Sequence, residues 1–138
     1  MGSLDDLKIL DFSTLLPGPY ATLMLADMGA EVLKISSASR PDIVLDYPPF
    51  IGDTGVSASQ AWLGRNKKTM FLNLKTGEGK AVVKELVKEY DIVLEQFRPG
   101  VMEKLGLGYE DLKAVNPKLI YCSLTGYGQT GPLRDAAG

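Results

Sequence analysis

The sequence has no histidine and only one cysteine among its 138 residues. Without histidine, this chain has no Ser-His or Cys-His catalytic pair, and it lacks the most common general base and metal ligand. The single thiol, Cys122, has no partner for an internal disulfide, and such cysteine usage is typical of a reducing compartment. We therefore expect a cytoplasmic protein with no metal site and no histidine-based active site in this chain.

The sequence also lacks an excess of charge and a long hydrophobic run. Its 15 Lys and Arg residues nearly balance 17 Asp and Glu residues, for a net charge of −2. This balance predicts no nucleic-acid partner and no anionic membrane partner. No apolar run approaches the roughly 18 residues of a membrane span, and the N-terminus does not resemble a signal peptide. A hydrophobic content of 45% is ordinary for a globular domain with a buried core.

What the sequence does contain is an alternation of short apolar runs with helical patterns. The expected strands are residues 7–12, 31–35, 69–74, 91–95 and 119–125. The expected helices are residues 20–28, 79–90, 101–105 and 109–115. Residues 36–60 have no clear period, and we expect a long loop there with at most one helical turn. The alternation predicts an α/β fold, with a Rossmann-like, open, mainly parallel sheet and helices on both faces.

Three burial predictions follow from these patterns. In the first helix, an apolar stripe at helical spacing predicts the face that packs on the sheet; it consists of Ala21, Met24, Leu25 and Met28. Asp27 is interpreted as a surface residue of the same helix. Cys122 lies inside the fifth apolar run, which is typical of a buried, inert thiol.

Ligands of an open parallel sheet bind beyond the carboxyl ends of the strands, so the loops that follow the apolar runs form the candidate site. Residues 15–20 follow the first run and either offer backbone amides to an anion or simply start the helix. Phe97 and Arg98 follow the fourth run, where both can stack on an adenine, although an aromatic residue after a strand is more often part of the core.

Four cations are close in sequence around the third strand, namely Arg65, Lys67, Lys68 and Lys75. Because the chain as a whole is slightly acidic, we expect a local site for a polyphosphate there; the alternative for each lysine is an ordinary surface charge. Residues 126–131 also form a Gly-x-Gly-x-x-Gly pattern, but it follows the fifth strand and precedes a proline. We interpret this pattern as a Gly-rich turn, with a nicotinamide-binding site as the minor alternative.

Several ordered sequence blocks resemble one enzyme family. They are Asp11-Phe12-Ser13, Pro17-Gly18-Pro19-Tyr20-Ala21-Thr22, residues 25–35, Asn66-Lys67-Lys68, residues 72–76, residues 95–102 and residues 116–132. Together they resemble the N-terminal part of the family III CoA-transferases of the CaiB/BaiF type. This family includes formyl-CoA transferases and α-methylacyl-CoA racemases.

The resemblance implies that residues 7–138 form a CoA-binding, Rossmann-like domain of a longer, homodimeric parent protein. Residues 1–6 are then an N-terminal extension, and Gly2-Ser3 is typical of a tag remnant. Coenzyme A or acyl-CoA is the expected substrate, with no metal. The expected CoA contacts are Leu16, Pro17, Arg40, Leu72, Lys75, Gln96, Phe97, Arg98 and Lys104. Family members often have an arginine shortly after the second strand, and Arg40, which comes a little later in this chain, is the provisional equivalent of that residue.

The resemblance also implies that the catalytic residues lie beyond Gly138. The transferases use an aspartate that forms covalent intermediates, whereas the racemases use a histidine and an aspartate. Ala136-Ala137-Gly138 resembles the racemase branch slightly more. Two functions stay open. One is the CoA-binding segment of an acid:CoA transferase or an α-methylacyl-CoA racemase, inactive alone. The other is a non-catalytic CoA-binding or dimerising interaction module.

Overall fold

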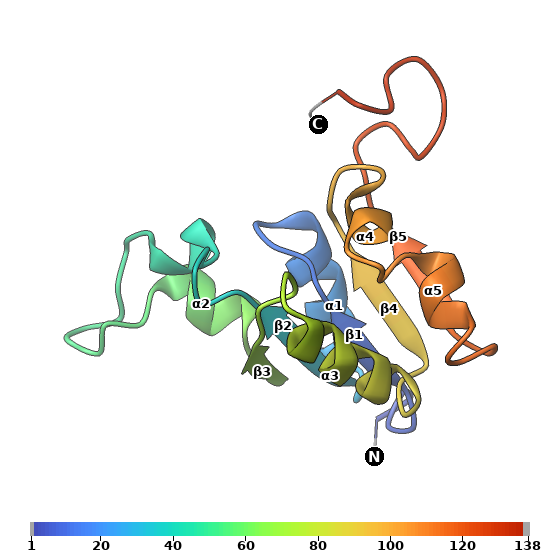
Figure 1. The fold of residues 1–138 in the computed structure, drawn as a ribbon. Coiled ribbons are helices and arrows are strands. Elements are labelled where there is room, and N and C mark those ends of the chain that lie inside the picture. The colour runs from blue at the N-terminus through green and yellow to red at the C-terminus, as the bar shows by residue number, and fades with distance from the viewer. Residues whose placement is uncertain (1, 137–138) are drawn as a thin grey trace.

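A computed structural model gives the fold of the chain and describes residues 2–136 (Figure 1). The strands are β1 (Lys8–Asp11), β2 (Glu31–Ser36), β3 (Lys67–Phe71), β4 (Ile92–Glu95) and β5 (Ile120–Ser123). The helices are α1 (Pro17–Asp27), the 3₁₀ helix η1 (Ile43–Asp46), α2 (Ala58–Leu63), α3 (Gly77–Val87), α4 (Val101–Lys104) and α5 (Tyr109–Lys113). Among the described residues, no helix is long and apolar enough to cross a membrane.

The five strands form one parallel sheet in the order β3-β2-β1-β4-β5. Strand β1 is central, since Ile9 is in register with Val32 of β2 on one side and with Ile92 of β4 on the other. From β1 the chain builds the sheet outward in one direction through β2 and β3, and then returns to add β4 and β5 on the other side. The switch point therefore lies between β1 and β4, where the loops at the carboxyl ends of these strands diverge and leave a crevice for ligands.

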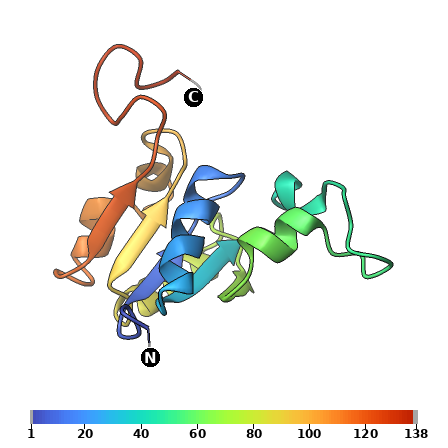
Figure 2. The ribbon, with the colours of Figure 1, turned by 180° about the vertical axis from the view of Figure 1, so that it is seen from behind.

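Helices cover both faces of the sheet, which confirms the predicted α/β architecture. Helices α3, α4 and α5 lie on one face, and α1 lies on the other (Figures 1 and 2). The larger core cluster lies beneath the three helices and includes the fully buried Leu10, Val83, Val93 and Leu112. The smaller cluster lies beneath α1 and consists of Ile9, Ala26, Ala30 and Val32.

The predicted buried face of α1 is wrong for Met24 and Met28, although Leu25 is partly buried against the smaller cluster. Met24 and Met28 are 49% and 48% exposed, and the residues that pack on the sheet are Gly18, Pro19, Thr22, Leu23 and Ala26. Apolar residues surround most of this helix, so their spacing does not distinguish one face from another. The buried face includes Thr22 because hydrogen bonds satisfy its hydroxyl group.

Residues 41–64, named the arm below, contain more structure than predicted. The arm projects from the β2–β3 side of the sheet and carries η1 and α2 (Figure 1). A side-chain cap starts each helix, because the Asp42 carboxylate accepts a hydrogen bond from the Val44 amide and Ser57 Oγ accepts one from the Gln60 amide. Strand β3, which follows the arm, begins at Lys67 and ends at Phe71 and is therefore shifted from the predicted residues 69–74.

The prediction that Cys122 is buried is wrong, since this residue is exposed. Cys122 and Ile120 lie on the same face of the edge strand β5, and Ile120 is 59% exposed. Helix α1 covers β1 and β2 on that face, and on the same face none of the described helices extends over β5 (Figure 2). An apolar strand is buried only where another element lies over it, so the apolar run alone predicted the strand but not its burial.

Two adjacent apolar residues of α1 allow a direct test of its buried face. Leu23 is 1% exposed and Met24 is 49% exposed. We expect Leu23→Ala to lower the free energy of unfolding by about 2–5 kcal/mol because it leaves a cavity. Met24→Ala, the matched control on the same helix, is expected to cost less than about 1 kcal/mol. Urea unfolding measures both, and equal costs for the two variants would contradict this packing.

Candidate functional site

The loops that follow β1 and β4 meet at the switch point of the sheet. Gln96, directly after β4, accepts a hydrogen bond at its Oε1 atom from the Gly18 amide in the first turn of α1, at 2.9 Å. A side chain at position 18 would collide with Ser13 and with this oxygen, so the close approach requires glycine. The structure thereby brings the predicted contact Gln96 next to the predicted contacts Leu16 and Pro17.

A buried carboxylate fixes the β1–α1 loop. Asp11, at the end of β1, is fully buried and accepts hydrogen bonds from the Ser13 amide at 2.8 Å, from the Ser13 hydroxyl and from Thr22 Oγ1 at 2.5 Å. Lys67 Nζ lies 3.8 Å from Asp11 Oδ2 and donates to Thr22 Oγ1 at 2.8 Å and to the Pro19 carbonyl at 2.6 Å. Side chains from β1, α1 and β3 thus hold the loop in one conformation.

Burial changes the protonation of Lys67. Its side chain is only 1% exposed, and burial lowers the pKa of its ammonium group from 10.5 to about 8, although the charge of Asp11 opposes this change. The charge of Lys34, on the neighbouring strand β2, lowers the pKa further. Lys67 therefore loses its proton in the folded protein under mildly alkaline conditions, well before a lysine in the unfolded chain does.

A second buried carboxylate fixes the loop after β4. Glu95 is 5% exposed and accepts a hydrogen bond from the Phe97 amide at 2.8 Å. Burial raises the pKa of Glu95, whereas hydrogen bonds from Ser123 and from the Phe97 amide oppose this rise. The Phe97 side chain packs partly buried against the larger core cluster, in agreement with the core alternative for this residue, and Arg98 is exposed.

The other predicted contacts lie at the loops after β2 and β3 and at the end of α4. Leu72 follows β3, and its amide donates to the Ser36 carbonyl at 2.9 Å, which joins the loops after β2 and β3. A cavity of about 180 Å³ lies between these loops and is lined by Ser37, Ala38, Ser39, Phe71, Leu72 and Asn73. Arg40 pairs with Ser37 in an isolated bridge, and Lys75 is exposed nearby in sequence. Lys104, at the end of α4, is also exposed.

The predicted polyphosphate cluster around β3 is wrong for three of its four cations. Arg65 Nε donates to Asp27 Oδ1 at 3.1 Å, Lys68 pairs with Glu31 at 3.3 Å, and Lys67 is buried. The hydrogen bond from Arg65 also lowers the pKa of Asp27. These cations lie at the amino end of β3, opposite the edge where ligands bind. They are close in sequence, but each interacts with a different carboxylate. Asp27 is exposed, as predicted.

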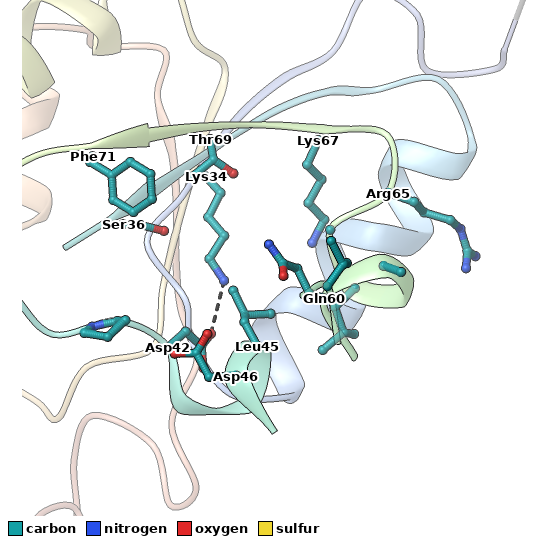
Figure 3. Close-up of a pocket in the computed structure, with 15 residues that line it drawn as sticks. Lys34, Ser36, Asp42, Leu45, Asp46, Gln60, Arg65, Lys67, Thr69 and Phe71 are labelled. Atoms are coloured by element: carbon teal, nitrogen blue, oxygen red, sulfur yellow. Dashed lines mark hydrogen bonds and ion pairs between the residues drawn. The ribbon is translucent and has the colours of Figure 1, made fainter. Parts of the chain in front are cut away.

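The sequence did not predict the larger pocket, which lies between the arm and the β2–β3 part of the sheet (Figure 3). Its volume is about 540 Å³, and Lys34 of β2 forms an ion pair in it with Asp42 of the arm, at 3.1 Å. Residues 36–60 have no hydrophobic period, so no pattern pointed to this pocket. The only available signals were Asp42 and Ser57, whose residue types favour helix N-caps.

Two further predictions concern metal and nucleotide sites. Within residues 2–136, no three Asp, Glu or Cys side chains lie close enough together to hold a metal ion. The Gly-rich segment 126–131 forms bends, and a turn at residues 132–135 follows it instead of a helix in the part described, so it lacks the loop-to-helix geometry of a dinucleotide site. Ala137 and Gly138, which carried the likeness to the racemase branch, lie outside the described residues.

Comparison with known proteins places the chain in one family. Residues 4–138 match the profile of CoA-transferase family III. The chain is 44% identical to "Succinyl-CoA--D-citramalate CoA-transferase" of Chloroflexus aurantiacus, over 98% of this chain and 33% of that protein. It is 43% identical to "Succinyl-CoA:glutarate CoA-transferase" of Homo sapiens, over 98% of this chain and 31% of that protein. The chain thus spans about a third of the length of these curated relatives.

A solved structure shows the same fold. The crystal structure of a CAIB/BAIF family protein from Brucella suis superimposes with a TM-score of 0.92 at 41% identity, over 99% of this chain and 37% of that one. The match extends over nearly all of the chain, including the arm.

The buried Lys67 predicts a specific dependence of stability on pH. Between its folded pKa of about 8 and its ordinary value of 10.5, the unfolded chain binds one more proton than the folded chain. The free energy of unfolding contributed by this group therefore rises with pH across that window, by on the order of 3 kcal/mol at most. Lys67→Met removes this rise, whereas Lys118→Met, at an exposed position, keeps it.

Urea unfolding at several pH values from 7 to 10 would measure this effect. At each pH, the free energy of unfolding of the variant is subtracted from that of the wild type, and the change of this difference with pH is the informative quantity. Lys67→Met also leaves Asp11 without its cation, but that cost is the same at every pH in this range and does not affect the change. Parallel pH profiles for wild type and Lys67→Met would show that Lys67 keeps its ordinary pKa.

Proposed function

The chain belongs to CoA-transferase family III, and from this membership we propose that it forms the CoA-binding segment of an enzyme that transfers coenzyme A between carboxylic acids. The observation that carries the proposal is the hydrogen bond between the Gly18 amide and Gln96 Oε1. It joins two predicted CoA-contact loops across the switch point of a parallel sheet, which is where ligands of such sheets bind.

The chemistry at the switch point suits the pantetheine and phosphate groups of coenzyme A. Leu16, at the N-cap of α1, is 50% exposed and offers an apolar surface beside the first turn of an 11-residue helix. The N-terminus of such a helix attracts negative charge. Arg98 and Lys104 are exposed on the β4 side and supply cations for phosphate oxygens.

The second group of predicted contacts extends the proposed site along the sheet edge. Leu72 lines the smaller cavity, and Lys75 and Arg40 are exposed after β3 and β2. Coenzyme A is long enough to engage more than one strand-end loop, with its nucleotide and its pantetheine arm at different loops. We propose that these three residues contact the CoA molecule bound at the switch point.

Transfer of coenzyme A is favoured over racemisation by the relatives, because the two described above are named as transferases acting with succinyl-CoA. Since the chain spans about a third of these relatives, we propose that the catalytic aspartate lies in the rest of the parent protein. That parent is proposed to be a homodimer. The role of the present residues is then to bind and orient the thioester.

Calorimetric titration with coenzyme A tests the binding proposal. We expect binding to the 138-residue chain, weakened about 10- to 100-fold by Arg98→Ala because a charge-assisted contact to phosphate is lost. Gln96→Ala is also expected to weaken binding, since it releases the β4 loop from α1. Lys118→Ala removes the same charge as Arg98→Ala at an exposed position away from the switch point, and is expected to have no effect. Absence of binding at roughly millimolar coenzyme A would contradict the proposal.

A turnover assay tests where the catalytic residues lie. When the chain is incubated with succinyl-CoA and glutarate, we expect no glutaryl-CoA, because the catalytic aspartate is proposed to lie in the rest of the parent protein. Chromatographic separation of the CoA esters would measure the products. Formation of glutaryl-CoA by the 138-residue chain would show that the catalytic group lies within it.

A further inference from the structure

The larger pocket has the composition of a ligand site, and the CoA contacts proposed above do not include it. Strands β2 and β3 form its floor, and η1 and α2 of the arm form its opposite wall (Figure 3). Its volume of about 540 Å³ lies in the range of small-molecule sites. Leu45 and Leu63 of the arm and Phe71 of β3 supply apolar walls around the Lys34–Asp42 ion pair.

The ion pair in this pocket is unequally satisfied. The Asp42 carboxylate accepts hydrogen bonds from Lys34, from the Leu15 amide at 3.0 Å and from the Val44 amide at 3.3 Å. Lys34 Nζ has three N–H donors, and within residues 2–136 the structure gives it the single acceptor Asp42 Oδ2. The Lys34 side chain is only 8% exposed. The buried Lys34 ammonium group therefore has donors left over, whereas the Asp42 carboxylate already accepts from three groups.

Neighbouring side chains add to this surplus of donors. Thr69 of β3 and Gln60 of α2 are exposed at the rim of the pocket, and in the described part of the chain their side chains make no hydrogen bond with protein groups. Arg65 points away from the pocket toward Asp27 (Figure 3). The other carboxylate in the lining, Asp46, is exposed, so solvent screens its charge. The buried ammonium group of Lys34, together with these two donors at the rim, thus favours an anion with hydrogen-bond acceptors.

We propose that this pocket binds the carboxylate of a small aliphatic acid through Lys34, with Thr69 and Gln60 as further donors. The aliphatic part of the acid packs on Leu45 and Phe71. The Leu15 amide bonds to Asp42 and so links the pocket to the β1–α1 loop of the switch point. The acid is the exchange partner in the CoA transfer, and in this respect the inference rests on the proposed function.

Glutarate is a suitable probe because it has two carboxylates on a short aliphatic chain. We expect glutarate to bind the 138-residue chain in the absence of coenzyme A, and its uncharged diamide of the same size to bind at least 10-fold more weakly. Calorimetry or amide chemical shifts at the pocket residues would measure both ligands. Binding of the diamide as tightly as glutarate would overturn the proposed role of the Lys34 charge.

Two variants locate the binding. The double variant Lys34→Met/Asp42→Asn removes both charges together, which avoids leaving one buried charge alone, and is expected to weaken glutarate at least 10-fold. Thr69→Val keeps the ion pair and is expected to weaken glutarate about 3- to 10-fold. Lys118→Met, the exposed control, should bind glutarate like the wild type. Unchanged affinity in both pocket variants would overturn the assignment.

The outcomes separate this inference from the proposed function. If coenzyme A binds and glutarate does not bind at roughly 10 mM, the pocket assignment fails and the CoA site stands. If glutarate binds with the expected variant pattern and coenzyme A does not bind, the carboxylate pocket stands and the CoA proposal fails. Loss of glutarate binding on Arg98→Ala would place the acid at the switch point instead of this pocket.

Discussion

The buried carboxylate of Asp11 is the interaction on which the geometry of the candidate site depends. A fully buried carboxylate is tolerated only when hydrogen bonds and a nearby cation replace its hydration. Asp11 accepts hydrogen bonds from Ser13 and Thr22 and lies close to the Lys67 ammonium group. These contacts connect the end of β1 to the first turns of α1 and to β3. The loop at the switch point is consequently held in place before any ligand arrives. A ligand that binds a preorganised loop loses less affinity to the ordering of that loop.

The β4 side of the switch point uses the same principle. Glu95 is buried at the carboxyl end of its strand and accepts the Phe97 amide, while Gln96 reaches across to the Gly18 amide. Two neighbouring strands therefore each end in a buried carboxylate that bonds to an amide two residues later, and the two loops are joined to each other. This arrangement explains why the predicted contacts at residues 16–17 and 96–98 form one region. It also explains why Phe97 packs toward the core and Arg98 is exposed.

The elements of the fold were predictable because each strand is a short apolar run between polar loops, and because a parallel sheet places all its strand ends on one edge. Features that depend on contacts distant in sequence were not predictable. The buried face of α1 follows from Thr22 bonding to Asp11, whereas the periodicity favoured Met24 and Met28. Arg65 pairs with Asp27, 38 residues away, so it did not belong to the cation cluster that its neighbours suggested.

Two lysines on one face of the neighbouring strands β2 and β3 show the same limit of sequence-based prediction at the larger pocket. Lys67 gives hydrogen bonds to two acceptors and faces the charge of Asp11, so its donors serve the fold. Lys34 shares the same sheet face but has a single acceptor, and that acceptor is already satisfied by two backbone amides. Both residues look alike in sequence, where each is a lysine in an apolar strand. The two lysines differ in the number of acceptors around the ammonium group, so one is structural and the other has donors left for a ligand. These acceptors belong to α1 for Lys67 and to the arm for Lys34, and both elements lie outside the strand of the lysine that they contact.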